Sequence, residues 1–335
     1  MSQQGTIRIA WIDLCKALGI FLVVFAHVDT TVVSSVYIFG FHMPLFFFLS
    51  GLVFNYEKYT LKTFLKSRIN GLIIPYVFFY LITYLYWLVI ERNVRPLGMS
   101  WWQPLIGLLK GTGHYTAHNG ILWFLPCLFM VETFFYLICI ICKNRLIQIS
   151  LILILTIVGF NIEIMLPWSI NVALTSLQFF AIGYGLKRII VADSFSRKAP
   201  LVFYLSGLLY FSFQGICQNK IGLVTANYGN IGEFESAAYL GISMFCSLSI
   251  LLKNNKFLSK WGEQIGRNTI VIFGIHGPLL RILRYLFELL FPSVELESNI
   301  LCSLIVSIIC MILLYPFIPL YNIVRERYLS KFYIR

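Results

Sequence analysis

Charged side chains are scarce in this sequence, and their scarcity excludes a soluble globular protein. Only 12% of the 335 residues are Asp, Glu, Lys or Arg, whereas 59% are hydrophobic. A soluble domain carries about 25% charged residues, so the chain lacks the polar surface that a soluble fold requires. Aromatic side chains make up 17% of the chain, which excludes intrinsic disorder. The composition predicts an all-α, polytopic integral membrane protein whose first partner is the lipid bilayer.

Metal-binding, redox and targeting patterns are lacking as well. Cys139 and Cys142 form a C-x-x-C, but no second pair of Cys or His accompanies it, so we predict no metal site. The first apolar segment contains Asp13 and Lys16 and has no small-residue cleavage site, which argues against a signal peptide. No internal repeat is evident, and we expect residues 1–335 to form a single transmembrane domain with no appended soluble domain.

Apolar segments of about 20 residues, the length needed to cross a bilayer, recur along the chain. A cytoplasmic N-terminus would place 19 of the 26 Lys and Arg residues in cytoplasmic segments and four in external loops, which is a strong positive-inside bias. Both termini are therefore expected inside, and the net charge of +12 needs no nucleic-acid partner. The predicted spans, about ten in number, are 9–33, 36–54, 72–90, 121–141, 147–166, 170–188, 200–217, 235–252, 268–290 and 300–323.

Three ionisable residues lie in the first predicted span, where such groups are costly and indicate function. Lys16 and His27 are eleven residues apart, or 20° past three full helical turns, so they share one face, and Asp13 lies one turn before Lys16 on the same stripe. Asp13 and Lys16 are equally well explained as an interfacial pair in which Lys16 extends to the membrane surface. His27 lies too deep for that explanation, and we interpret it as functional.

Further polar residues fall in later spans. His42 precedes Pro44, which we expect to bend its helix, and the short connection should return His42 close to His27. Two converging imidazoles indicate a proton-handling site, although a structural histidine or a zinc ligand is an alternative for His42. In the ninth span, Arg281 is expected to face either an anionic substrate group or an internal acidic partner such as Glu288.

Other candidate residues have topological explanations beside the functional one. Lys66 and Arg68 end a cytoplasmic loop, where they either satisfy the positive-inside rule or bind phosphate. Trp123 is either an interfacial anchor or the wall of a sugar site. Glu132 lies deeper in its span and needs a partner.

Two sequence blocks resemble the membrane-bound acyltransferase family 3. The first contains Asp13, Lys16 and His27 within residues 12–27, and the second is Phe41-His42-Met43-Pro44 continued by LFFFLSG. Weaker matches follow in order over most of the chain, at Lys66–Arg68 with Pro75-Tyr76, at Leu122–Pro126, at Phe179–Tyr184, and from Ile265-Gly266 to His276.

The resemblance implies that His27 is the essential histidine of the family. Lys16 stands where many members of the family have Arg. The paired glutamates that commonly follow the Trp motif are absent from this sequence. In these features the sequence is more similar to the fucose-acetylase-like branch of the family. Members transfer acyl groups, usually acetyl from acetyl-coenzyme A, to hydroxyls of surface polysaccharides and related glycans.

We therefore expect a multi-pass O-acetyltransferase of the bacterial inner membrane, acting on a cell-surface or lipid-linked glycan. The alternative is a transporter or flippase of lipid-linked sugars, since broken helices and intramembrane charges suit both. The expected catalytic residues are His27, His42 and Asp13, those that hold acetyl-coenzyme A are Lys16, Lys66 and Arg68, and those that contact the acceptor are Trp123, His276 and Arg281.

Overall fold

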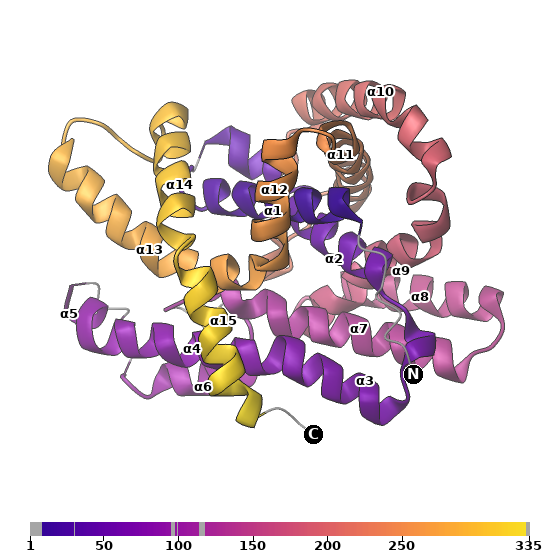
Figure 1. The fold of residues 1–335 in the computed structure, drawn as a ribbon, viewed down its shortest axis with the longest axis horizontal. Helices are drawn as coiled ribbons and strands as arrows, with labels where there is room; N and C mark the ends of the chain where they lie inside the picture. Colours follow the sequence, from indigo (N-terminus) through magenta and orange to yellow (C-terminus); the bar gives the residue numbers. More distant parts are fainter. Residues whose placement is uncertain (1–8, 30, 95–97, 99, 114–117, 333–335) are drawn as a thin grey trace.

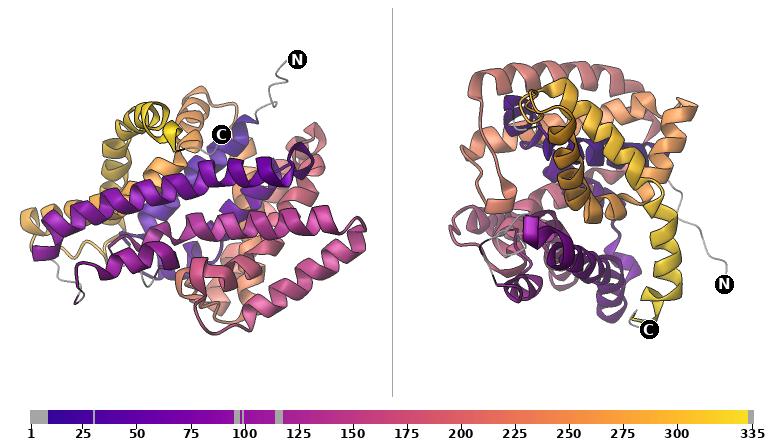
Figure 2. Two further views of the ribbon diagram at one scale, coloured as in Figure 1. Left: turned by 90° about the horizontal axis from the view of Figure 1, so that it is seen from below. Right: turned by 90° about the vertical axis from the view of Figure 1, so that its left-hand side faces the viewer.

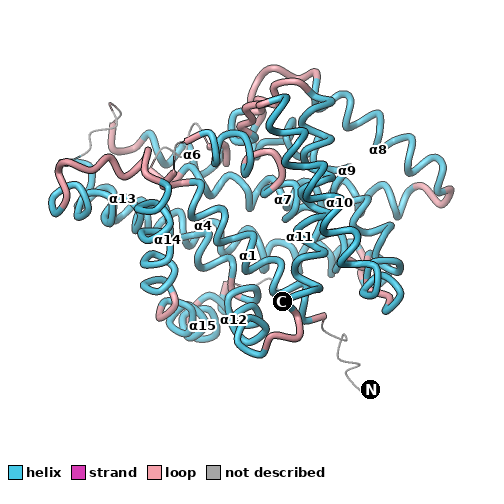
Figure 3. Tube along the Cα trace, turned by 90° about the horizontal axis from the view of Figure 1, so that it is seen from above, coloured by secondary structure: helices cyan, strands magenta, loops and turns pink. Residues whose placement is uncertain are grey.

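The computed structural model describes residues 9–29, 31–94, 98, 100–113 and 118–332, and within these ranges it is built from helices and loops without a β-strand (Figures 1 and 3). The all-α prediction is thereby confirmed. The α-helices are α1 Ala10–Ala26, α2 His42–Val53, α3 Leu61–Arg68, α4 Ile74–Tyr86, α5 Arg92–Val94, α6 Gln103–Lys110, α7 Phe124–Ile141, α8 Arg145–Phe160, α9 Ile170–Ile190, α10 Asp193–Cys217, α11 Ile231–Leu252, α12 Lys256–Arg267, α13 Thr269–Leu290, α14 Ile300–Leu314 and α15 Phe317–Arg327. Short 3-10 or π segments are η1 Val33–Ile38, η2 Tyr56–Lys58, η3 Ile69–Ile73, η4 Trp87–Glu91, η5 Gly120–Trp123, η6 Pro167–Ser169, η7 Leu223–Thr225 and η8 Leu329–Lys331.

Eight helical segments among the described residues are long and apolar enough to cross a membrane. They correspond to eight of the ten predicted spans. The other two predicted spans, 9–33 and 147–166, are shorter in the structure, where α1 has 17 residues and α8 has 16. A polytopic membrane protein is confirmed, while the cytoplasmic position of both termini stays a prediction.

The first span is shorter than predicted, and a buried aspartate fixes the turn that follows it. The Asp29 carboxylate accepts hydrogen bonds from the backbone N–H of Ser34 at 3.2 Å and from the side chains of Thr31 and Ser34 at 2.8 and 2.7 Å. Aspartate at such a position offers the backbone an alternative to helical hydrogen bonds. Asp29 therefore fixes the turn between α1 and η1, so its partners are structural.

One long helical run carries several candidate residues. From Leu61 to Val94 the chain is continuously helical over 34 residues, and Figure 2 shows it extending across the molecule. It starts at a capping box formed by Thr60 and Thr63, well before the predicted boundary at residue 72. At 1.5 Å per residue it is about 50 Å long, longer than the roughly 30 Å hydrocarbon core, so its first turns extend beyond that core.

Helix α1 lies at the centre of the bundle, and other helices face the lipid. Most of its side chains are buried, and it contacts α2, α11, α12, α13 and α14. By contrast, α10 and α8 expose large apolar side chains, such as Leu208 at 67% and Ile157 at 61%. An apolar surface of this kind is stable in a bilayer and not in water. The central helix carries Lys16, and His27 follows its last residue.

Candidate active site

Three histidines from three helices lie close together. His27 follows the last residue of α1, His42 is the first residue of α2, and His276 lies in the middle of α13. The rings of His27 and His276 meet edge to face, with their centroids 5.2 Å apart, and His42 is within electrostatic reach of His27. The predicted approach of His42 to His27 agrees with this geometry. His276 was predicted to contact the acceptor, and nothing in the sequence indicated that it lies beside His27.

Each of these imidazoles is oriented by the backbone carbonyl four positions before it. Nδ1 of His27 lies 2.6 Å from the carbonyl oxygen of Val23, Nδ1 of His42 lies 2.9 Å from that of Ile38, and Nδ1 of His276 lies 2.8 Å from that of Ile272. Because a carbonyl oxygen only accepts, each Nδ1 carries the hydrogen, and the neutral ring presents a lone pair at Nε2. Three potential proton acceptors are thus held in one tautomer.

The three histidines differ in exposure. His42 and His276 are buried, at 5% and 0%, while His27 is exposed. Helix α1 ends at Ala26, which leaves the ring of His27 at a helix terminus, while the depth of His27 in the membrane stays a prediction. The backbone N–H of His27 bonds the carbonyl of Val24 at 3.2 Å, which leaves the Val23 carbonyl for the imidazole. An accessible ring with a fixed tautomer suits contact with a substrate.

Side chains of α10 support the break in the backbone just before His42. The Tyr210 hydroxyl donates to the carbonyl of Tyr37 at 2.6 Å, and the Gln214 amide donates to the carbonyl of Val36. The predicted bend is present, but it lies between η1 and α2. Pro44 occupies the first turn of α2, where a backbone N–H has no helical partner.

A cavity of about 260 Å³ is lined by charged side chains from α1, α3 and α7, namely Lys16, Arg68 and Glu132. Nε of Arg68 lies 2.9 Å from a carboxylate oxygen of Glu132, and Lys16 is within electrostatic reach of that carboxylate. The guanidinium of Arg68 also lies over the rings of Phe54 and Tyr59, 5.2 and 5.3 Å from their centroids. Arg68 is thus the partner that was predicted for Glu132 from its position deep in the span.

The structure brings Lys16 and Arg68 together but leaves Lys66 outside this cavity. Successive residues on the long helix point in different directions, and Lys66 precedes Arg68 by two positions, about 200° around the axis. Arg68 therefore faces the cavity, and Lys66 does not. The assignment of Lys66 to the donor site therefore has no support from the cavity geometry.

Phenylalanines separate this cavity from the histidines. Phe46, Phe124 and Phe273 line the cavity, and the ring of Phe124 lies 6.0 Å from Phe46 and 5.3 Å from Phe273 between centroids. Phe273 is in turn 6.1 Å from His276, and Phe46 is one helical turn beyond His42. The aromatic layer lies between the two polar regions.

Trp123 borders the same layer. It is buried at 5%, and its ring contacts Phe124 with centroids 6.2 Å apart. Its burial excludes an interfacial anchor at the lipid surface. A role as a wall of the acceptor site stays a prediction.

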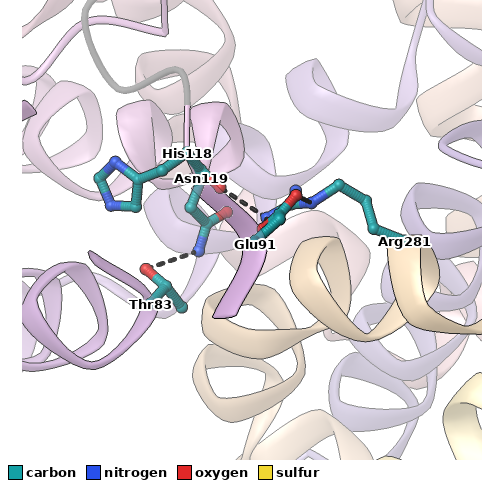
Figure 4. Close-up of polar contacts among 5 residues, drawn as sticks. All are labelled: Thr83, Glu91, His118, Asn119 and Arg281. Atoms are coloured by element: carbon teal, nitrogen blue, oxygen red, sulfur yellow. Dashed lines mark hydrogen bonds and ion pairs between the residues drawn. The ribbon is translucent and has the colours of Figure 1, made fainter. Parts of the chain in front are cut away.

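Arg281 belongs to a buried polar network, drawn in Figure 4. Its guanidinium binds both carboxylate oxygens of Glu91, at 2.5 and 3.0 Å, and the backbone carbonyl of His118 at 2.7 Å. The expected partner Glu288 is therefore wrong, and Glu91 takes its place. Contact of Arg281 with a substrate stays a prediction, and any such contact would compete with this bidentate pair.

Asn119 joins the same network, and sequence reasoning missed it. Pro278 has no N–H, so the carbonyl of Gly274 lacks its helical donor, and the Asn119 amide donates to that carbonyl at 2.9 Å. The Gly-Pro pair in α13 signalled an unsatisfied carbonyl, but the partner lies 155 positions away. Asn119 therefore holds η5 against the part of α13 that contains Pro278.

Asp13 lies apart from the histidines. It is 14 positions before His27 on the same helix, which is about 20 Å, and it is buried at 7%. Gly266 of α12 packs directly on its backbone, since a Cβ at Gly266 would overlap the carbonyl oxygen of Asp13. The structure does not bring Asp13 to His27, so a step shared by these two side chains is excluded.

Metal ligation is not suggested by this geometry. Across the described part of the chain, no three His, Cys, Asp or Glu side chains are grouped so that they could hold a metal ion. The histidines are instead arranged as proton acceptors.

Comparison with known proteins gives one match. A family model described as an acyltransferase domain matches residues 9–316. Neither the curated proteins nor the solved structures contain a match to the chain. The matched range includes the histidines, the charged cavity and the Arg281 network.

Proposed function

The chain belongs to the acyltransferase family 3, and from this membership we propose that it transfers acetyl from acetyl-coenzyme A to a sugar hydroxyl. The acceptor is a cell-surface or lipid-linked glycan, and the site of action is a bacterial inner membrane. The observation that carries the proposal is the accessible imidazole of His27, whose tautomer is fixed by the Val23 carbonyl. It lies across an aromatic layer from a cavity lined by Lys16 and Arg68.

The charged cavity suits the donor. Coenzyme A carries phosphates, which Arg and Lys bind through charge-assisted hydrogen bonds, and it is made in the cytoplasm, where the charge bias places this end of α1. Lys16 and Arg68 would hold the phosphate nearest the thioester arm. The arm would then extend past Phe46, Phe124 and Phe273 toward His27.

The histidine cluster suits the transfer step. Nε2 of His27 takes the proton of the acceptor hydroxyl as the hydroxyl oxygen attacks the thioester carbonyl. The C–S bond then breaks, the new ester keeps the acetyl group, and the imidazolium returns its proton to the coenzyme thiolate. His42 and His276 orient the ring of His27 or the acceptor.

Labelled acetyl-coenzyme A tests this reaction in membranes that contain the full chain. We expect label in the glycan or lipid-linked sugar fraction with the wild-type chain and none with His27→Ala at the same level of inserted protein. Equal incorporation in both membranes would contradict the proposal. The family membership leaves the flippase alternative without support, and sugar translocation without acetyl transfer would restore it.

A further inference from the structure

A second open cavity lies on the other side of the helical wall that carries Arg68. It has a volume of about 470 Å³ and is bounded by the long helix and by the C-terminal helix α15, which crosses α4 in Figure 1. Rings of Tyr321 on α15 and Phe79 on α4 stack there, with centroids 5.1 Å apart. Its lining includes Ser67, Asn70, Gly71, Ile270, Arg325 and Glu326.

The two cavities share a wall and a lining residue. Ile270 lines both of them. On the long helix, Arg68 and Leu72 face the first cavity, while their neighbours Ser67 and Gly71 face the second. A ligand that passes Ile270 would therefore occupy both cavities at once.

The first cavity is too small for a complete coenzyme. Pockets that enclose drug-sized ligands measure about 300–1,000 Å³, and the first cavity measures about 260 Å³. It suits the narrow thioester arm, and the bulky nucleotide end needs another place. The second cavity, of about 470 Å³, adjoins it where the arm would emerge.

The second cavity offers groups that recognise phosphate. It presents the guanidinium of Arg325 and the side chains of Asn70 and Ser67. Within the described ranges, the Arg325 side chain forms no ion pair or hydrogen bond with another residue. Glu326 is exposed at the same edge, so the cavity is mixed in charge and Arg325 is its cation. Guanidinium binds phosphate through two parallel hydrogen bonds.

We propose that the second cavity binds the nucleotide end of the acyl donor, with Arg325 on the phosphate of its ribose, while the thioester arm passes Ile270 into the first cavity. This inference rests on the proposed function and assigns one end of its donor to α15. It makes Arg325 a donor-binding residue remote from the transfer step.

Two variants change this site without disturbing the rest of the molecule. Arg325→Gln removes the cation, and Arg327→Gln, on the same helix but outside the cavity lining, is its matched control. Gly71→Leu fills the cavity, because an added Cβ at Gly71 meets no atom within 4 Å. A helical glycine is also a weak helix former, so this replacement should not impair folding.

The measurements use the purified full chain with acetyl-coenzyme A, 3′-dephospho-acetyl-coenzyme A and adenosine 3′,5′-bisphosphate. Loss of a hydrogen bond to a charged group corresponds to about tenfold to hundredfold weaker binding. We expect Arg325→Gln to raise KM for acetyl-coenzyme A and Kd for the bisphosphate by that factor, with kcat unchanged. Arg325→Gln should affect the 3′-dephospho donor little. Gly71→Leu should weaken binding of both ligands that carry the 3′-phosphate, and Arg327→Gln should match the wild type.

The outcomes separate this site from the proposed function. Unchanged Kd for the bisphosphate in Arg325→Gln, or an equal loss for the donor with and without its 3′-phosphate, would overturn the site while leaving the transfer reaction standing. Calorimetric binding of coenzyme A that depends on Arg325, in a chain that transfers no acetyl group, would support the site and refute the reaction. If the wild-type chain neither binds nor uses any of the three ligands, both are refuted.

Discussion

The two polar regions inside this bundle hold their ionisable groups in different ways. In the first cavity, opposite charges meet directly, as in the 2.9 Å contact of Arg68 with Glu132. In the histidine cluster, backbone carbonyls hold the rings, and each Nδ1 is bonded to the carbonyl oxygen four positions before it. Paired charges suit the binding of a charged donor, whereas fixed imidazoles suit proton transfer. The difference indicates a division between donor binding and chemistry.

The same helices supply both regions. On α1, Lys16 lines the cavity and His27 lies about 16 Å further along; on α13, Phe273 lines the cavity and His276 follows one turn later. The donor cavity and the histidine cluster therefore lie a short distance apart along the same helices. Changes in the histidine cluster should lower kcat, and changes in the cavity should raise the donor KM.

The largest effect is expected for His27→Ala, which removes the accessible imidazole. A positioned general base contributes about 10²- to 10⁴-fold, so kcat should fall by that factor while the donor KM stays constant. Initial rates of acetyl transfer at varied acetyl-coenzyme A measure both constants.

His42→Ala is the comparison for that variant. Its ring is buried at 5% and bonded to Ile38, so it acts through its neighbours, and kcat should fall less than in His27→Ala. Membrane insertion should be normal in both variants. Acylation by well-inserted His27→Ala at a near-normal rate would refute the assignment of the base.

The local sequence pattern predicted that the first segment is helical but not the residue at which α1 ends. The apolar pattern correctly predicted a helix around Lys16, but His27, expected inside the same span, follows the last residue of α1. Apolar length predicted the eight spans that the structure contains. The turn that follows Ala26 is fixed by the hydrogen bonds that the Thr31 and Ser34 hydroxyls donate to Asp29. Such bonds compete with the helix locally, and hydropathy does not register them.

Partners distant in sequence could not be predicted at all. Glu91 and Arg281 are 190 positions apart, and His27 meets His276 only because α1 and α13 pack together. The cost of intramembrane charge correctly indicated that Glu132 and Arg281 need partners. Which partners they take depends on the packing of helices, and a single sequence does not specify that.

An intermediate effect is expected for Arg68→Ala, on the donor side of the comparison. Loss of a charge-assisted hydrogen bond corresponds to about 1.5–3 kcal/mol, so the donor KM should rise about tenfold to hundredfold with little change in kcat. Donor titrations of the acetyl-transfer rate test this directly. An unchanged KM would leave Arg68 with a structural role beside Glu132.

Glu132→Gln is the control that distinguishes an effect of Arg68→Ala on donor binding from its effect on stability. Removing one member of a buried ion pair costs about 3–5 kcal/mol of stability, so Arg68→Ala should also unfold at lower temperature. Glu132→Gln keeps the shape and a hydrogen-bond acceptor for Arg68 but removes the negative charge from the cavity. Its donor KM should therefore be no higher than that of the wild type, and a rise comparable to Arg68→Ala would show that the pair, not the cation, is needed.

The smallest effect is expected for Lys16→Arg, which tests whether the cavity needs only a positive charge at this position. Lys16 is half-buried and lines the cavity beside Arg68 and Glu132, and Arg keeps the charge while adding a planar fork. A change below about 1 kcal/mol, as for a partly solvated ion pair, corresponds to about fivefold or less in donor KM. Lys16→Gln, of similar length but uncharged, should raise KM more than Lys16→Arg does. If both replacements instead lower kcat by the factor expected for His27→Ala, Lys16 acts in the transfer step itself, and the division between the two regions fails.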